Sequence, residues 1–162
     1  YLCCAHGSTG CARLLINQGV DVNAKGHFKR TPLLAASEHG HSECCALLIH
    51  KGAQLDCRDY NGNTALMMAC VKGHVACVSL LLAAGADVNI VNGAGKSALM
   101  QLCQDSVLDV ECRDEIVSLL MAKGARNSRG VGCFSFFFTK ASCLAETQGY
   151  LSTAAIIQNS AR

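Results

Sequence analysis

The sequence holds 162 residues, of which 51% are hydrophobic and 16% are charged, with a formal net charge of +2. This composition excludes an intrinsically disordered chain, and the weak net charge gives no reason to expect nucleic acid or an anionic membrane as the partner. No apolar run approaches the roughly 18 residues of a membrane-spanning helix, and residues 1–20 lack the basic-then-apolar layout of a secretory signal. We therefore expect one domain with a sizeable core.

The chain opens with YLCCAHGSTGC, residues 1–11, whose cysteines could be metal ligands, disulfide partners or core residues. The whole sequence contains 12 cysteines. Secreted disulfide scaffolds of that density are short and poor in core, unlike this chain, so we expect reduced thiols and an intracellular location, cytoplasmic or nuclear. No Cys-x2-Cys pair occurs in the sequence, which argues against a zinc site. We expect no metal and no cofactor.

Three sets of landmarks recur with a period of 33 residues. In the first set, a hydroxyl residue precedes a short apolar run. In the other two sets, a glycine follows an apolar segment. The members are Thr31, Thr64 and Ser97, then Gly7, Gly40 and Gly73, and then Gly19, Gly52 and Gly85. Such a period indicates stacked supersecondary units, each too small to bury its own apolar face.

Residues 31–62 show the physical chemistry of one unit. Thr31 is a hydroxyl N-cap, and Pro32 stands at the first helical position, where its missing N–H costs nothing. Gly40 can end this helix in a left-handed conformation. A second helix is predicted from about Ser42 to Lys51, followed by a turn-rich segment that ends in DYNG, residues 59–62.

These motifs resemble those of the ankyrin-repeat family, namely TPLL at residues 31–34, Gly-His at residues 40–41 and GADVN at residues 85–89. The resemblance implies an all-α fold, a solenoid of helix-turn-helix units with hairpin-like loops. It covers nearly the whole chain as a single domain, residues 1–162. The expected repeats are about 1–25, 26–58, 59–91, 92–130 and 131–162.

The chain also departs from the family pattern. It begins inside the first helix of a repeat, so we expect either a fragment of a longer protein or an N-terminal cap that precedes residue 1. Gly85 and Gly124 are 39 residues apart instead of 33, and the surplus falls around residues 106–111, between the helices of the fourth repeat. The fifth repeat is degenerate, with additional residues near 131–134. The motif histidine is replaced in every full repeat, by Leu34, Met67 and Met100.

In this register most cysteines stand where the family has small core residues. We expect these to be buried, unpaired and metal-free: Cys3, Cys4, Cys11, Cys44, Cys45, Cys70, Cys77 and Cys103. Cys57, Cys112 and Cys133 fall in predicted turns or insertions, which makes them the candidates for a redox-responsive role.

The family resemblance implies a non-catalytic interaction module or adaptor that binds a protein or peptide on the concave face of the stack. The alternative is the substrate-recognition arm of a larger enzyme, such as a ubiquitin ligase or a kinase. Cations on this face suggest a partner with acidic character. By register the predicted binding residues are His27, Phe28, Arg30, Glu38, His39, Tyr60, Asn61, Asn63, Val71, Lys72, Lys96, Gln104 and Asp105.

The remaining motifs give weaker evidence about function. The tripeptide Gly95-Lys96-Ser97 resembles the end of a phosphate-binding loop, but the required earlier glycine is Ile90, and no signature of nucleophilic catalysis occurs, so we expect no enzyme. Asn23 and Asn89 resemble sites that asparaginyl hydroxylases modify; alternatively, each hydrogen-bonds its own hairpin. The stretch GVGCFSFFFT, residues 130–139, could either cover the end of the stack or form a docking surface.

Overall fold

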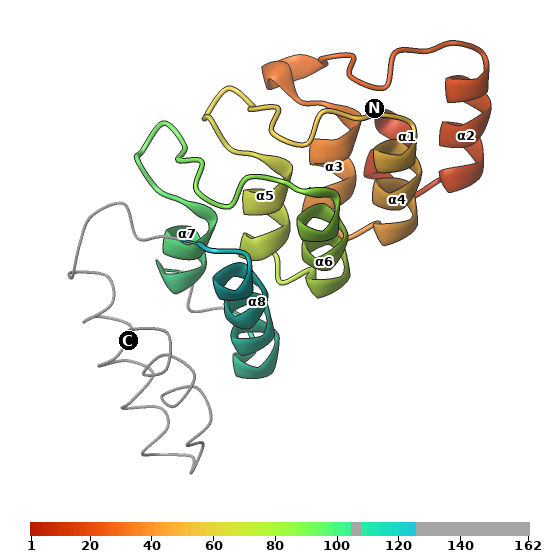
Figure 1. Ribbon diagram of the computed structural model, residues 1–162. Coiled ribbons are helices and arrows are strands. Elements are labelled where there is room, and N and C mark those ends of the chain that lie inside the picture. The colour runs from red at the N-terminus through yellow and green to blue at the C-terminus, as the bar shows by residue number, and fades with distance from the viewer. Residues whose placement is uncertain (105–107, 126–162) are drawn as a thin grey trace, which may run out of the picture. The chain divides into compact units, whose positions relative to one another are not determined.

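The computed structural model describes residues 1–104 and 108–125, which belong to one compact unit, Tyr1–Arg126. These residues form helices and loops and no strand. The helices are α1 (Leu2–Ala5), α2 (Thr9–Asn17), α3 (Pro32–Glu38), α4 (Ser42–His50), α5 (Ala65–Val71), α6 (Val75–Ala84), α7 (Ala98–Gln104) and α8 (Val110–Ala122), with a 3-10 turn η1 (His27–Lys29) (Figure 1).

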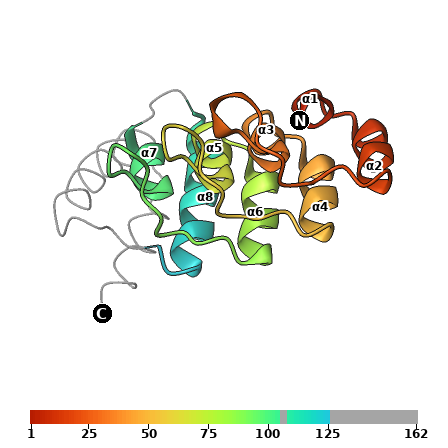
Figure 2. The same cartoon turned by 90° about the horizontal axis from the view of Figure 1, so that it is seen from above.

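The helices of this unit stand in two rows. Figure 2 shows α1, α3, α5 and α7 in one row and α2, α4, α6 and α8 in the other. Each repeat contributes one helix to each row, and a long loop leads from the second helix to the first helix of the next repeat. The predicted all-α solenoid of helix-turn-helix units is confirmed. Its single-domain extent over residues 1–162 stays a prediction, because the expected fifth repeat lies outside the described residues.

The predicted helix starts and ends are also confirmed. The hydroxyl of Thr31 accepts a hydrogen bond from the backbone N–H three residues on at 3.3 Å, and Thr64 and Ser97 do the same at 3.4 Å. Gly40 has a φ of 75°, and a Cβ there would come within 2.6 Å of the His74 ring. The His74 Nε2 lies 3.1 Å from a backbone carbonyl oxygen of the preceding repeat. Glycine therefore ends the helix and makes room for an inter-repeat contact.

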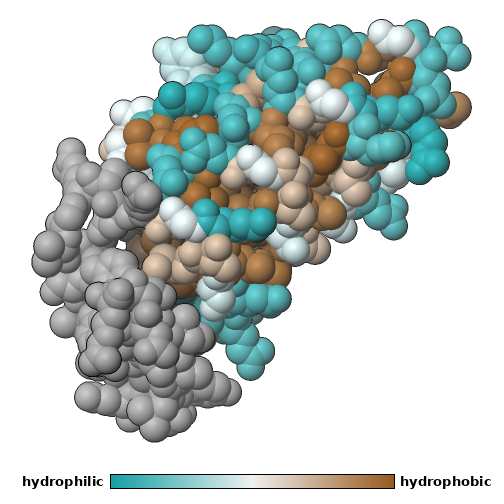
Figure 3. Space-filling model, in the orientation of Figure 1, coloured by the Kyte–Doolittle hydropathy of each residue, from teal (hydrophilic) through white to brown (hydrophobic). Residues whose placement is uncertain are grey.

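The core lies between the two rows of helices. Its largest fully buried apolar side chains come from both helices of the second, third and fourth repeats: Leu33, Leu48, Leu66, Met67, Val78, Leu81, Leu102, Ile116 and Leu120. Full burial of a leucine or isoleucine side chain contributes about 2 kcal/mol. Figure 3 shows apolar residues over the middle of this face, with hydrophilic residues along the edge where Figure 1 has the loops. The substituted motif positions are part of this core, since Leu34 and Met100 are buried as well.

The fourth repeat accommodates only part of its surplus residues in the predicted place between its two helices. The connection runs from the end of α7 at Gln104 to the start of α8 at Val110. Part of the surplus lengthens α8, which has 13 residues, compared with 9 in α4 and 10 in α6. The prediction that Cys112 lies in a turn is therefore wrong: it lies in the first turn of α8. Within the described residues no helix has the length and apolarity to cross a membrane.

Candidate interaction surface

Three loop tips, the fingers, stand beyond the first helices. Finger 2 is residues 26–30, finger 3 is residues 59–63 and finger 4 is residues 92–96 (Figure 1). Each finger is the turn that precedes a first helix, so the repeat register places the three side by side along the stack. Their backbone geometry decides which side chains they present.

Finger 3 is built around Asp59. Its carboxylate accepts a hydrogen bond from the backbone N–H of Asn63 at 2.8 Å, and its own N–H donates to the Asn63 carbonyl at 3.0 Å. Gly62 has a φ of 80° and donates its N–H to the Asp59 carbonyl at 3.0 Å. Finger 4 repeats this design with Asn92 and with Gly95, whose φ is 71°. A side-chain acceptor, buried in finger 3 and half-buried in finger 4, and a left-handed glycine together close each turn.

Finger 2 has neither a side-chain acceptor nor a left-handed glycine. Gly26 stands where finger 3 has its aspartate, and Lys29 stands where it has its glycine. Only backbone bonds close the turn, from Gly26 N–H to the Arg30 carbonyl at 2.9 Å and from Arg30 N–H to the His27 carbonyl at 3.2 Å. Phe28 and Lys29 have φ values of 57° and 58°, a conformation that costs an L-residue about 1–2 kcal/mol. Finger 2 is a strained turn.

Backbone hydrogen bonds join neighbouring fingers. The N–H of Tyr60 donates to the Phe28 carbonyl at 2.9 Å, and the N–H of Gly93 donates to the Asn61 carbonyl at 2.8 Å. Both bonds span 32 residues, so the same link is used from one repeat to the next. The fingers therefore form a continuous hydrogen-bonded row.

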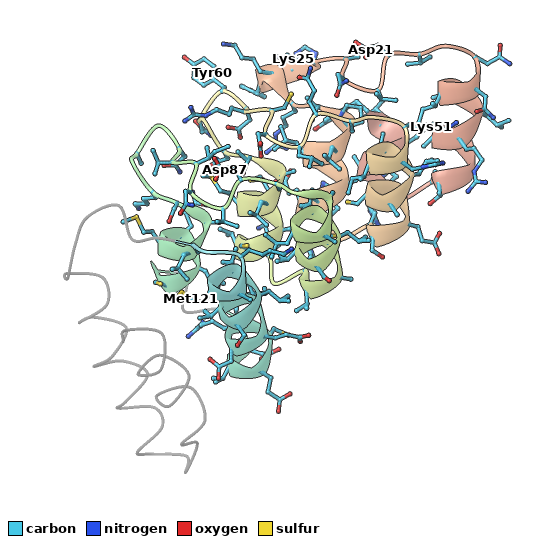
Figure 4. The ribbon with its side chains drawn as sticks, viewed as in Figure 1. Asp21, Lys25, Lys51, Tyr60, Asp87 and Met121 are labelled. Carbon is cyan, nitrogen blue, oxygen red and sulfur yellow. The ribbon has the colours of Figure 1, made fainter. Side chains whose placement is uncertain are left out.

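The structure places most of the predicted binding residues either on the fingers or at the carboxyl ends of α3 and α5, about 10 Å of helix away from the fingers. Phe28 and Tyr60 are each 74% exposed, and Figure 4 shows Tyr60 at the outer end of its loop. Val71 and Lys96 are half-buried. The side chain of Gln104 and the whole of Asp105 lie outside the described residues. The other exposed members of the predicted set are His27, His39, Asn61 and Lys72.

Arg30 and Glu38, predicted as two separate partner contacts, bind each other. The guanidinium Nη1 lies 2.7 Å from Oε2, and Nη2 lies 3.3 Å from Oε1, a two-point ion pair. Hydrogen bonding to the Tyr1 side chain and the Glu38 carboxylate raises the pKa of Arg30, although partial desolvation opposes this. The pair links finger 2 to the end of α3, and its two charges compensate each other.

Asn63 is held in a polar network. Its side-chain oxygen accepts from Asn92 Nδ2 at 2.9 Å and from Gln101 Nε2 at 3.1 Å. The network joins finger 3 to finger 4 and to α7. Sequence reasoning did not single out Gln101, yet a lone amide within the apolar run ALMQLC was the available signal.

The two asparagines that resemble hydroxylation sites make inter-repeat contacts. Asn23 Oδ1 accepts from the backbone N–H of Gln54 at 2.8 Å, and Asn89 Nδ2 donates to the Gly124 carbonyl at 3.4 Å. The N–H of each asparagine donates to the aspartate two residues before it, at 2.8 Å in both cases. These bonds tie each loop to the next repeat. Modification of either residue stays a prediction.

The cysteines of the inner repeats lie in the core, as expected. Cys44, Cys45, Cys70 and Cys77 are buried and free, as is Cys4 near the beginning of the chain. Burial raises the pKa of Cys4 to about 11 and that of Cys70 to about 12, so both stay protonated thiols at neutral pH.

The expected burial of Cys11 is wrong, and Cys3 and Cys103 are only half-buried. At the position equivalent to Cys11, the Sγ of Cys44 lies 3.3 Å from the Thr9 Oγ1 of the preceding repeat. Cys11 points in the same direction from α2, but no described element packs against that side of α2. Among residues 1–104 and 108–125, no three histidine, cysteine, aspartate or glutamate side chains are placed to hold a metal ion.

Comparison with known proteins agrees with this architecture. The family model for ankyrin repeats (3 copies) matches residues 1–92, more than half of the chain. No curated protein matches the chain. The matched region holds α1 to α6 and fingers 2 and 3, together with the capping residues Thr31 and Thr64 and the glycines of the 33-residue period. Ankyrin repeats are in general protein–protein interaction modules, and this chain belongs to the ankyrin-repeat family.

Proposed function

We propose that the domain is a non-catalytic adaptor that binds a protein partner on the finger surface. This surface consists of fingers 2, 3 and 4 with α3 and α5, the helices that follow fingers 2 and 3. The observation that carries the proposal is the pair of aromatic side chains, Phe28 and Tyr60, which are each 74% exposed on neighbouring, hydrogen-bonded fingers. Large exposed apolar side chains that stand together mark interaction sites, and tyrosine is enriched among binding hot spots.

The backbone supports this assignment. Backbone hydrogen bonds of 2.8–2.9 Å join the fingers into a row. The side chains of Asp59 and Asn92 accept hydrogen bonds from the backbone of fingers 3 and 4. A surface held in one conformation loses little conformational entropy when a partner binds. The strain at Phe28 and Lys29 also fits a binding role, because a residue kept in a costly conformation often serves recognition.

The charges on the finger surface favour an acidic partner. Lys29 and Lys72 are exposed and Lys96 is half-buried, whereas Glu38 is neutralised by Arg30 and Asp59 is buried. An acidic segment could contact the lysines while an apolar side chain packs on the aromatic pair. The net charge of +2 for the whole chain gives no comparable support for nucleic acid. We further propose an intracellular site of action, which agrees with the free thiols among the described residues.

The test removes the two aromatic rings and leaves the Arg30–Glu38 pair intact. Phe28→Ala combined with Tyr60→Ala should abolish the capture of specific partners by the full chain, as measured by quantitative pull-down. The matched control is Leu2→Ala combined with Leu14→Ala, which removes two apolar side chains that are 69% and 67% exposed away from the fingers. Equal capture by the wild type and the aromatic double variant would contradict the proposal, provided that both unfold at the same temperature.

A further inference from the structure

A groove with a volume of about 610 Å³ lies between α2 and α4. These helices belong to the row of second helices, whereas the finger surface adjoins the row of first helices (Figure 2). The apolar part of the lining is Ala46 and Leu47 of α4. Across from them, α2 presents Thr9, Arg13 and Asn17, spaced four residues apart and therefore on one face of the helix. The groove is separate from the finger surface and has its own chemistry.

The charges of the groove are unevenly distributed. Arg13, His50 and Lys51 line it, and within the described part of the chain none of their side chains forms a hydrogen bond or an ion pair. The only acidic residue of the lining is Glu43, whose Oε2 lies 3.5 Å from the Thr9 hydroxyl. Glu43 is in the first turn of α4 and Lys51 follows its last turn, so about 12 Å of helix separates them. The groove therefore presents nitrogen donors that do not pair with the acidic side chain of its lining.

Two of these donors have a local structural explanation, and one does not. His50 and Lys51 lie at the carboxyl end of α4, where a positive charge offsets the helix dipole. Arg13 lies in the middle of α2, where it offsets no helix end. Its guanidinium offers the planar set of donors that matches a carboxylate, and Asn17, one turn further along, offers an amide.

We propose that this groove is a second docking site, for a short acidic segment of a protein partner. Its carboxylates would contact Arg13 and Lys51, and an apolar side chain would pack on Ala46 and Leu47. Arg13 and Lys51, with a glutamate in the same groove, suit a few carboxylates better than a polyanion such as nucleic acid. Because the fingers adjoin the other row of helices, the domain could hold two partner segments at once, as a bridging adaptor does.

The experiment uses the full chain and a fluorescein-labelled peptide of alternating Asp and Leu residues, with binding followed by fluorescence anisotropy at low ionic strength. Arg13→Glu combined with Lys51→Glu should weaken binding at least tenfold. The control is Lys25→Glu combined with Lys123→Glu, two exposed lysines outside the groove and the fingers, which makes the same change in net charge and should alter binding less than twofold. Arg13→Gln combined with Lys51→Gln, which places no new acid in the groove, should weaken binding severalfold and replaces the first variant if that one fails to fold.

Each alternative outcome overturns the groove proposal in a recognisable way. Unchanged binding in the groove variants, with loss of binding in Phe28→Ala combined with Tyr60→Ala, would place the acidic peptide on the fingers. Equal losses in the groove and control variants would indicate general charge attraction, and no binding to the wild type would mean that the groove does not accept acidic segments. The proposal for the fingers would survive the last two outcomes, because it is tested through the aromatic pair.

Discussion

Fingers 2 and 3 occupy equivalent positions in neighbouring repeats but are stabilised in different ways. Finger 3 has a buried aspartate that accepts from the backbone and a glycine in the left-handed region. Finger 2 has glycine and lysine at these positions, so Phe28 and Lys29 adopt left-handed conformations without a side-chain acceptor to hold them. The difference shows that one finger is stabilised by its own residues, whereas the other depends on its surroundings, namely the bond from Tyr60 and the Arg30–Glu38 pair.

The largest expected effect comes from Gly62→Ala in finger 3. The new Cβ would lie 2.7 Å from the backbone nitrogen of Gly93, and the φ of 80° would be strained as well. We expect a loss of about 3 kcal/mol in the free energy of unfolding, measured by urea denaturation. Gly52→Ala is the matched control, because its φ is 81° but no atom lies within 4 Å of the added Cβ. Equal losses of unfolding free energy in the two variants would show that finger 3 shifts to accommodate the added methyl group.

Asp59→Ala should cost less, about 2 kcal/mol, since it leaves the N–H of Asn63 without its acceptor in a partly buried turn. Chemical denaturation measures the loss, and amide exchange at Asn63 should accelerate. Glu115→Ala removes an exposed carboxylate of the same charge from α8 and should leave stability nearly unchanged. If both variants were equally stable, backbone bonds alone would be sufficient to close finger 3.

Lys29→Gly gives finger 2 the residue that finger 3 uses. We expect a gain of roughly 0.5–1 kcal/mol, because relief of the left-handed strain exceeds the entropy cost of glycine. The gain should appear as a higher melting temperature. Lys25→Gly, an exposed lysine before the finger whose φ is not positive, should instead lower stability slightly. A melting temperature of Lys29→Gly below that of the wild type would show that finger 2 is not strained.

The smallest expected effect concerns the ion pair that links finger 2 to α3. A double-mutant cycle of Arg30→Ala and Glu38→Ala should give a coupling energy of about 0.5 kcal/mol, because both side chains remain partly exposed, at 29% and 18%. The coupling should fall when salt is added. A coupling of zero at low salt would mean that finger 2 is held by backbone bonds alone.

Much of the fold could be predicted from the sequence, because its signals are local. Thr31, Thr64 and Ser97 cap their helices through an N–H only three residues away, and Gly40 ends a helix through its own φ. The 33-residue period made these signals recognisable as one repeating unit. Placement of Phe28 and Tyr60 on the fingers followed from the same register, although their use by a partner stays a proposal.

The rest depended on neighbours that a repeat register does not reveal. Cys11 and Cys44 occupy the same place in their repeats, yet only Cys44 has a described helix packed over it. The ion pair of Arg30 with Glu38 and the bonds of Gln101 to Asn63 join residues from different elements. Local capping chemistry determined where α3, α5 and α7 begin. Burial, pairing of charges and the strain of finger 2 were decided by the tertiary structure, because each depends on which atoms the stack brings within contact distance.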